Sequence, residues 1–200
     1  MIVVISNGYA TLAQTKAVLR ISDANDDAIL EQSIEAASRR IDGYCGRFFY
    51  QKNATVSLYA LTNYVCPTEN DLVSATTVKT DDDGDGSFET TWTAGTDYQL
   101  EPLDTTITGL PYRKITAIGG KTFPLFVIPN RPGVQIAGVW GFSAIPTDVE
   151  EACVLLSIRG FARYNAALGV VGFADMAIQV RAIDPDVRDL LNPYRKIAVA

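Results

Sequence analysis

The spacing of apolar residues predicts two helices in the first quarter of the chain. Thr11 and Gln14 have the types and spacing of a capping box, so a short helix is expected from there to about Arg20. A longer helix is expected over 26–45, followed by Gly46 as its end. Its apolar residues recur at intervals of three and four along one stripe, and they are Leu30, Ile34, Ala37, Ile41 and Tyr44.

Between residues 55 and 140 the apolar pattern changes to a period of two, which is typical of half-buried strands. Gly and Pro residues between the segments mark turns. Short strands are expected at 56–58, 76–78, 88–92, 97–100, 114–118 and 134–139. This part of the chain is therefore predicted to form an antiparallel, β-rich lobe inserted between helices.

A helix returns over 146–164, and it is apolar on two sides. One apolar stripe contains Val149, Ala152, Cys153 and Leu156. The second contains Leu155, Ile158 and Ala162. Such a helix needs two packing partners. One is expected to be the core of the same chain, and the other is either an identical subunit or more of the same chain.

The C-terminal residues predict a loop, an extended segment and a short helix. Gly169 and Gly172 flank the loop, and alternation over 176–182 indicates a strand or extended arm. Asp184 and Pro185 suit the start of a helix that ends before Pro193. The predicted fold class is thus α+β: a small helical bundle, in which the long N-terminal helix packs with a C-terminal helix, with an inserted antiparallel β lobe and an extended C-terminal arm. The expected boundaries are 1–52, 53–142 and 143–200.

Composition excludes several classes of enzyme. The 200 residues contain no histidine, so Ser-His-Asp and Cys-His catalysis and the HExxH zinc helix are absent. Cys45, Cys66 and Cys153 are odd in number and far apart, which favours buried apolar side chains in a reducing compartment over disulfides. No catalytic residue, resident metal or cofactor is expected.

Charge is concentrated in one segment. Residues 69–104 contain ten acidic side chains and one basic one, whereas the whole chain has a net charge of −6. Residues 105–200 are mildly basic, with ten basic and seven acidic side chains. This asymmetry suits a protein that presents different faces to different neighbours, although a solvated acidic lobe also explains it.

No membrane or targeting segment is expected. No stretch approaches the ~20 apolar residues of a membrane span. The apolar start, 1–5, is short and has no basic residue before it. The protein is expected to be intracellular and soluble as made, or to be part of a particle assembled inside a cell.

One acidic motif has chemical character. Asp81, Asp83 and Asp85 alternate and are followed by Gly86, as in the first half of an EF-hand calcium loop. The twelfth position, where a bidentate Glu belongs, is Trp92. The favoured interpretation is a hairpin tip with hydrated acids, in which Asp-Gly supplies the turn. Weak calcium binding by the 81–89 loop is the alternative.

Paired charges elsewhere predict surfaces rather than chemistry. Glu150 and Glu151 lie in a first helical turn, where the helix dipole favours negative charge. Arg39-Arg40 and Arg195-Lys196 are interpreted as solvated faces or intersubunit salt bridges. No Gly-rich loop precedes Lys-Ser/Thr, so no nucleotide site is expected.

The order and spacing of several segments resemble the head–tail connector (adaptor) proteins of tailed bacteriophages and gene-transfer particles. The segments are Tyr9-Ala10-Thr11-Leu12, 26–38, Cys45-Gly46-Arg47-Phe48-Phe49, 146–152, 184–187 and Pro193-Tyr194-Arg195. The hairpin over 76–92 and the following Ala94-Gly95-Thr96-Asp97-Tyr98 are similar to the β insertion of the longer members. Residues 100–140 match less clearly.

This resemblance implies a non-enzymatic ring of about twelve copies in the neck of a virion. The ring would lie beneath the portal protein, continue the channel for double-stranded DNA without sequence-specific binding, and dock a stopper or tail-completion protein. The residues expected to contact the portal are Arg181, Arg188, Tyr194, Arg195 and Lys196. Those expected at the interface between subunits are Arg39, Arg40, Arg47, Arg159 and Arg163.

Overall fold

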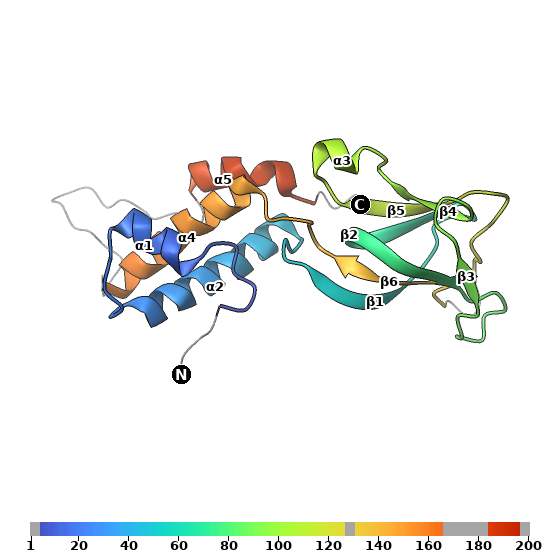
Figure 1. The fold of residues 1–200 in the computed structure, drawn as a ribbon, viewed down its shortest axis with the longest axis horizontal. Coiled ribbons are helices and arrows are strands. Elements are labelled where there is room, and N and C mark those ends of the chain that lie inside the picture. The colour runs from blue at the N-terminus through green and yellow to red at the C-terminus, as the bar shows by residue number, and fades with distance from the viewer. Residues whose placement is uncertain (1–4, 127–130, 166–183, 197–200) are drawn as a thin grey trace. The chain divides into compact units, whose positions relative to one another are not determined.

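The chain divides into two units in the computed structural model, which describes residues 5–126, 131–165 and 184–196. The helical unit comprises residues 1–50 and 144–200, and the β lobe comprises residues 51–143 (Figure 1). The boundaries predicted from the sequence fall between residues 52 and 53 and between residues 142 and 143. Helices and an antiparallel sheet occur together, as the predicted α+β class requires. The predicted arm over 176–182 lies outside the described residues.

The first two helices begin and end where their residue types require. In α1 (Leu12–Leu19) the predicted capping box is present: Gln14 N donates to Thr11 Oγ1 (3.2 Å), and Thr11 N donates to Gln14 Oε1 (2.7 Å). α2 (Asp27–Cys45) ends at Gly46, whose φ of 66° is left-handed. Lys16 and Asp27 join the two helices through a 2.6 Å ion pair.

The C-terminal helices complete the helical unit. α4 (Thr147–Asn165) packs against α2, and α5 (Pro185–Leu191) packs on both. A short 3-10 turn, η1 (Asn192–Tyr194), follows α5. The core side chains buried in this unit include Leu30, Ile34, Ile41, Val149, Leu156, Val187 and Leu191. None of the helices in the described ranges is long and apolar enough to span a membrane.

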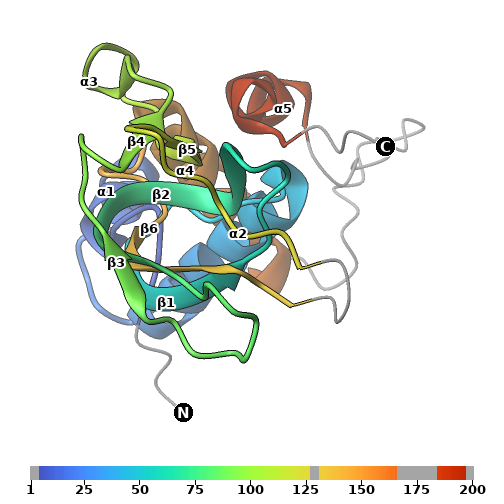
Figure 2. The same ribbon diagram turned by 90° about the vertical axis from the view of Figure 1, so that its right-hand side faces the viewer.

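The β lobe is built on one antiparallel, strongly curved sheet (Figure 2). Its strands are β1 (Lys52–Leu58), β2 (Val65–Thr80), β3 (Thr90–Trp92), β4 (Tyr98–Glu101), β5 (Tyr112–Ala117) and β6 (Val134–Trp140). The order is β1-β6-β2-β5-β4, with β3 pairing with the end of β2. A single turn, α3 (Thr105–Thr108), lies between β4 and β5, and none of its residues is buried.

Aromatic and aliphatic side chains fill the inside of this sheet. Trp92 and Phe123 stack with their ring centroids 4.7 Å apart, and Trp92 Nε1 donates to Thr80 Oγ1 (3.1 Å). Ile115 and Ile136 are fully buried. Cys66 is also buried, and burial raises the pKa of its thiol to about 12. The three cysteines are buried and free, as predicted.

Glu101 and Lys114 form a cross-strand ion pair at the β4–β5 edge (2.8 Å). Hydrogen bonds from Lys114, Thr116 and Gln99 lower the pKa of Glu101 from 4.5 to about 2. A lowered pKa means that the ionised form stabilises the fold above pH 4.5 and that this contribution is lost as the pH falls from 4.5 to about 2. We therefore expect Glu101→Gln to lower lobe stability at pH 7 by about 1 kcal/mol, and the difference from wild type to vanish near pH 2.

Thermal melts of both proteins across this pH range measure the effect. Lys114→Met removes the ion-pair partner of the Glu101 carboxylate and should therefore reproduce much of the same pH dependence. A stability difference that stays constant from pH 7 to about pH 2 would contradict the assignment of the shift to this pair.

Candidate functional site

A buried polar contact fixes the pairing of α2 with α4. Ser38 Oγ donates to Ile34 O within α2 (2.8 Å) and lies 3.4 Å from Cys153 Sγ on α4. Tyr9 N donates to the same Ser38 Oγ (3.0 Å). Ser38 and Cys153 are small enough to let the two helices and the segment before α1 meet at one point. The helical unit is therefore held in register by specific contacts as well as by apolar packing.

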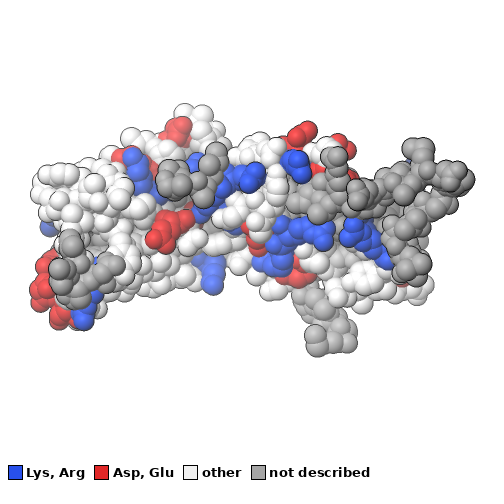
Figure 3. Space-filling model, turned by 180° about the vertical axis from the view of Figure 1, so that it is seen from behind, with Lys and Arg blue, Asp and Glu red and all other residues white. Residues whose placement is uncertain are grey.

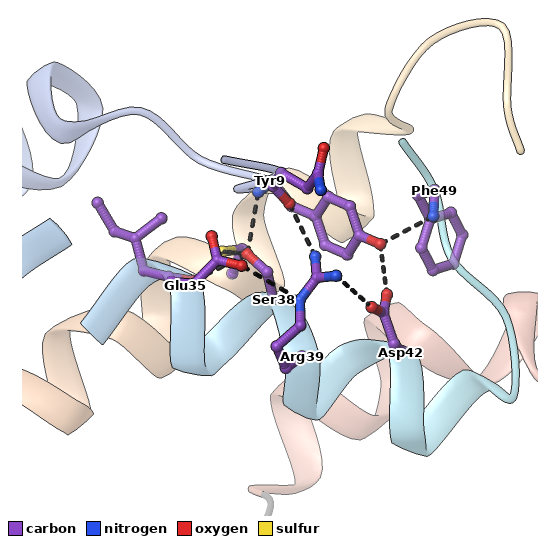
Figure 4. A network of polar contacts seen from close by, with 9 residues as sticks. Tyr9, Glu35, Ser38, Arg39, Asp42 and Phe49 are labelled. Carbon is purple, nitrogen blue, oxygen red and sulfur yellow. Dashed lines mark hydrogen bonds and ion pairs between the residues drawn. The ribbon is translucent and has the colours of Figure 1, made fainter. Parts of the chain in front are cut away.

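A network around Tyr9 ties the N-terminal segment to α2 (Figure 4). The Tyr9 hydroxyl donates to Asp42 Oδ1 and accepts from Phe49 N (2.8 Å). Arg39 pairs with Asp42 (3.1 Å) and Glu35 (3.5 Å), and it donates to the carbonyl of Asn7 (2.8 Å). The side chain of Arg39 is thus engaged within its own chain.

Burial sets the protonation of this network. Desolvation and the hydrogen bond to Asp42 raise the pKa of Tyr9, so its hydroxyl keeps its proton and remains a donor. Desolvation also raises the pKa of Asp42, although Tyr9 and Arg39 oppose that rise. These residues form a structural anchor for the start of the chain.

Removing the Tyr9 hydroxyl should destabilise the helical unit. Tyr9→Phe removes the acceptor of the Phe49 amide and the tyrosine donor to Asp42 Oδ1, while Arg39 still pairs with Asp42 Oδ2. An unsatisfied buried polar group costs about 1–3 kcal/mol. We expect a loss of about 2 kcal/mol, measured by denaturant unfolding. Tyr50→Phe is the matched control, since no hydrogen bond to the Tyr50 hydroxyl is found among the described residues. Equal losses for both variants would contradict the anchoring role.

The second apolar side of α4 is not used by the core. Leu155 is 39% exposed, Ala162 is exposed and Ile158 is half-buried, whereas Val149, Ala152 and Leu156 on the first side are buried. Exposed apolar residues on one helix side are typical of a surface that another molecule covers.

A groove lies between α2 and α4 on the first side. It has a volume of about 300 Å³ and is lined by Ser33, Ala36, Ala37, Arg40, Leu156, Gly160, Arg163 and Tyr164. Arg40, Arg163 and Tyr164 are exposed at its rim, and no ion pair engages either arginine among the described residues. Basic side chains gather on the face of the protein that Figure 3 shows.

The structure separates the five arginines predicted at the subunit interface into two groups. Arg39 is engaged with Glu35 and Asp42, Arg159 is paired with Asp184, and Arg47 is only 8% exposed. Arg40 and Arg163 lie exposed on the same groove. The interface role stays a prediction, and Arg40 and Arg163 are the two side chains placed to carry it.

The residues predicted to contact the portal lie at the C-terminal end of the helical unit. Arg188 is exposed on α5, and Arg195 is exposed with its guanidinium 5.1 Å from the centre of the Tyr44 ring. Tyr194 donates to Asp148 (3.3 Å) and packs edge-on against Phe49. Lys196 N donates to Cys45 O (2.8 Å), and Arg181 lies outside the described residues.

The acidic motif forms the predicted hairpin tip between β2 and β3, but the prediction that its acids are hydrated is wrong for Asp81, whose carboxylate the backbone amides of the turn surround. Asp81 is fully buried, and its carboxylate accepts from Gly84 N (2.7 Å) and Gly86 N (2.9 Å). Gly84 (φ 81°) and Gly86 (φ 99°) are left-handed, as the tight turn requires. Trp92, at the position of the missing calcium ligand, is buried in the lobe.

Four carboxylates nevertheless gather at this tip. One oxygen from each of Asp81, Asp83, Asp85 and Glu89 lies within 4.8 Å of the others, and all but Asp81 are exposed. Such a set of oxygen ligands suits a hard cation such as Ca²⁺. Without a positive partner the exposed acids repel one another.

Comparison with known proteins finds a family likeness for part of the chain. Residues 9–90 match the family model of phage gp6-like head-tail connector proteins. The predicted resemblance to head–tail connectors is confirmed. The connector segment includes α1, α2, β1, β2 and the acidic tip, and therefore also the Tyr9 network. No curated protein sequence matches the chain.

Solved structures show a similar fold over the whole chain. A chain from the neck of an empty GTA (gene transfer agent) particle, computed with C6 symmetry, has a TM-score of 0.59 at 17% identity, covering 99% of this chain and 95% of that one. A chain from the neck of a native GTA particle, computed with C12 symmetry, has a TM-score of 0.57 at 20% identity, covering 99% of this chain and 94% of that one. A chain from the virion of a native GTA particle has a TM-score of 0.58 at 19% identity, covering 100% of this chain and 95% of that one. At these identities the likeness establishes a shared fold.

Sequence reasoning missed two features of the structure. The Tyr9 network joins residues more than 30 positions apart, and no local pattern marks it. The groove was missed because Ser33 and Gly160 carry no signal of their own. Arg40 and Arg163 were singled out by charge, but only the pairing of α2 with α4 brings them to one place.

Proposed function

We propose that this protein is a structural, non-enzymatic connector in the neck of a tailed phage or a phage-like particle. Copies of the chain form a ring of about twelve beneath the portal protein. The ring continues the channel for double-stranded DNA and docks a stopper or tail-completion protein. The observation that carries the proposal is the match of residues 9–90 to the connector family, together with a whole-chain fold shared with proteins of GTA necks.

The exposed second side of α4 supports a ring. Closed cyclic assemblies need a surface on each copy that a neighbour covers. Leu155, Ile158 and Ala162 supply an apolar surface of this kind, continuous along one side of the helix. Copies packed side by side through α4 would bury it.

The charge of the chain suits a conduit for DNA. Phosphate binding strengthens with each basic contact, so a strongly basic channel wall would hold DNA and slow its exit. A net charge of −6 disfavours such retention. The exposed bases at the C-terminal end of the helical unit, Arg188 and Arg195, are then available for the portal protein.

The test is to locate the chain in particles purified from cells that make it. Cryo-electron microscopy should find a ring of this fold between the portal and the tail, and deletion of the coding sequence should leave DNA-filled heads and separate tails. Particles that lack the chain at the neck, or that join heads to tails without it, would overturn the proposal.

A second candidate function is calcium-dependent binding through the 81–89 tip of the β lobe. The observation that favours it is the set of four carboxylate oxygens within 4.8 Å of one another. Calorimetric titration with calcium tests it, with Asp85→Asn as the variant that removes one ligand charge. If millimolar calcium produces no heat of binding and no thermal shift, this function is eliminated.

A further inference from the structure

The groove between α2 and α4 has the chemistry of a carboxylate-binding site. Its floor is apolar, made by Ala36, Ala37, Leu156 and Gly160. Two guanidiniums, from Arg40 and Arg163, stand at its rim without an ion pair among the described residues. Exposed arginines beside an apolar floor are characteristic of protein interfaces, in which Arg and Tyr are enriched.

Ser33 supplies an independent sign of a missing ligand. Its side chain lies on the groove and is only 4% exposed, yet its hydroxyl has no hydrogen-bond partner within the described ranges of the chain. A Cβ placed on Gly160 would lie 3.5 Å from this hydroxyl, so the hydroxyl faces the stretch of α4 that lines the groove. Buried polar groups are almost always satisfied. An incoming oxygen acceptor would satisfy this one.

The acidic tip of the β lobe has the opposite charge to the groove and offers acceptors in place of donors. Asp83, Asp85 and Glu89 are exposed and crowded, and Arg131 lies beside this turn, donating to Gly84 O (3.0 Å). The tip projects beyond the last paired residues of β2 and β3, Thr80 and Thr90. The turn packs closely on Phe126 and Arg131, and it presents the carboxylates of Asp83, Asp85 and Glu89 to solvent, where a positive partner can reach them.

We propose that, in the ring, the acidic tip of one copy binds the α2–α4 groove of the next copy. The inference rests on the proposed ring and names one of its contacts. Carboxylates of the tip meet the guanidiniums of Arg40 and Arg163, and one accepts from Ser33 Oγ. A groove of about 300 Å³ has room for about two side chains, because deleting one large aliphatic side chain opens a cavity of about 150 Å³.

A second copy fits this groove better than DNA does. DNA phosphates are contacted through basic, polar surfaces, whereas this groove has an apolar floor and Tyr164 at its rim. The tip and the groove are different surfaces of one chain, so their contact is heterologous and generates a ring when the rotation closes.

Charge reversal tests the pairing with the full chain. One variant reverses the groove (Arg40→Glu with Arg163→Glu), and the other reverses the tip (Asp83→Lys with Asp85→Lys). Sedimentation measures self-association in about 0.1 M and about 1 M salt, because charge pairs weaken at high salt. We expect wild type to associate at low salt and each variant alone to associate at least about tenfold more weakly, the loss of about one strong contact.

The mixture of the two variants is the decisive sample. The groove variant keeps its acidic tip, which can bind the unchanged basic groove of the tip variant. The tip variant has a basic tip, which can bind the acidic groove of the groove variant. Association of the mixture should therefore return to within a few-fold of wild type. The melting curve of the groove variant should match wild type, since Arg40 and Arg163 are exposed. The tip variant should melt slightly lower but fold, because Asp83 and Asp85 accept hydrogen bonds within the turn from Asp85 N (3.1 Å) and Ser87 N (2.7 Å).

Ser33→Ala adds a second, independent measurement. It removes a buried hydroxyl that lacks a partner, so the isolated chain should become more stable. If the hydroxyl donates across the interface, association should weaken about threefold to tenfold at the same time. A purely structural role for Ser33 does not predict that stability rises while self-association weakens. Unchanged self-association of Ser33→Ala would overturn the part of Ser33 in the contact.

The outcomes separate this contact from the ring itself. Association of wild type that neither variant weakens, or a mixture that fails to recover, overturns the tip–groove contact and leaves the ring standing. Absence of any association up to millimolar protein counts against the contact and the ring together. Association that requires calcium and ignores groove reversal assigns the tip to a cation. If wild type also binds DNA, and groove reversal removes DNA binding but leaves self-association unchanged, the groove is a phosphate-binding site.

Discussion

Gly138→Ala is expected to destabilise the β lobe by about 3 kcal/mol, which is roughly a 10 °C fall in its melting temperature. Gly138 lies in β6 opposite Ala75, where the β2–β6 register shifts on both sides. A Cβ at this position would lie 2.2 Å from Ser74 O and 3.2 Å from Ala75 Cα. Both are backbone atoms, so no rotamer change relieves the overlap and the central strand pair must separate.

Gly43→Ala is the matched control, with an effect of opposite sign. Gly43 lies within α2, and nothing lies within 4 Å of the Cβ that alanine would add. Alanine favours helix over glycine by about 1 kcal/mol, so this variant should melt at a higher temperature. Calorimetry of both variants decides the matter. If Gly138→Ala melts with wild type, the close approach of β2 and β6 is wrong.

Leu155→Glu is expected to abolish assembly while leaving the isolated chain folded. The side chain is 39% exposed on the second side of α4, so a charge there costs little in the isolated chain. Burying the same charge without a partner between two copies costs about 3 kcal/mol or more, which is roughly a hundredfold loss of association. Electron micrographs of particles made with this variant should show heads without tails.

Val18→Glu controls for the change itself. Val18 is an apolar residue on α1 that is 60% exposed, and it lies on a different helix from the proposed contact. Particles carrying Val18→Glu should be complete. Complete particles with Leu155→Glu, or an unfolded Leu155→Glu chain, would remove the second side of α4 from the interface.

Local signals predicted the helices well because their ends depend on neighbouring residues. Thr11 and Gln14 cap α1 through bonds to one another, and Gly46 ends α2 because it adopts a left-handed φ. Burial along α4 follows the spacing of its apolar residues. These features need little information from the rest of the chain.

The long strand β2 was predicted only in part, for a physical reason. The sequence predicts a strand at 76–78, whereas β2 runs from Val65 to Thr80. Pro67 and Glu69 suggest a loop, and Glu69 does adopt a positive φ of 52°. The strand continues through this irregularity because it pairs with β5 before it and with β6 after it. Such pairing is decided by tertiary structure.

The candidate surfaces were predictable in charge but not in geometry. The resemblance to connector proteins pointed to Arg40 and Arg163, and the spacing of a sequence motif pointed to the acids of the 81–89 tip. Only the fold shows that Arg39, Arg47 and Arg159 are occupied or buried, while Arg40 and Arg163 share one groove. An arginine in the sequence carries no sign of whether a carboxylate of its own chain reaches it.

The way the chain enters and leaves the β lobe has an evolutionary consequence. β1 and β6 pair from Lys52 opposite Trp140, and Gln51 donates to Ser143 O (2.7 Å), so the two crossings lie side by side. Adjacent ends are what domain insertion and excision require. A lobe inserted at this position can therefore be lengthened, shortened or exchanged without breaking a helix of the helical unit.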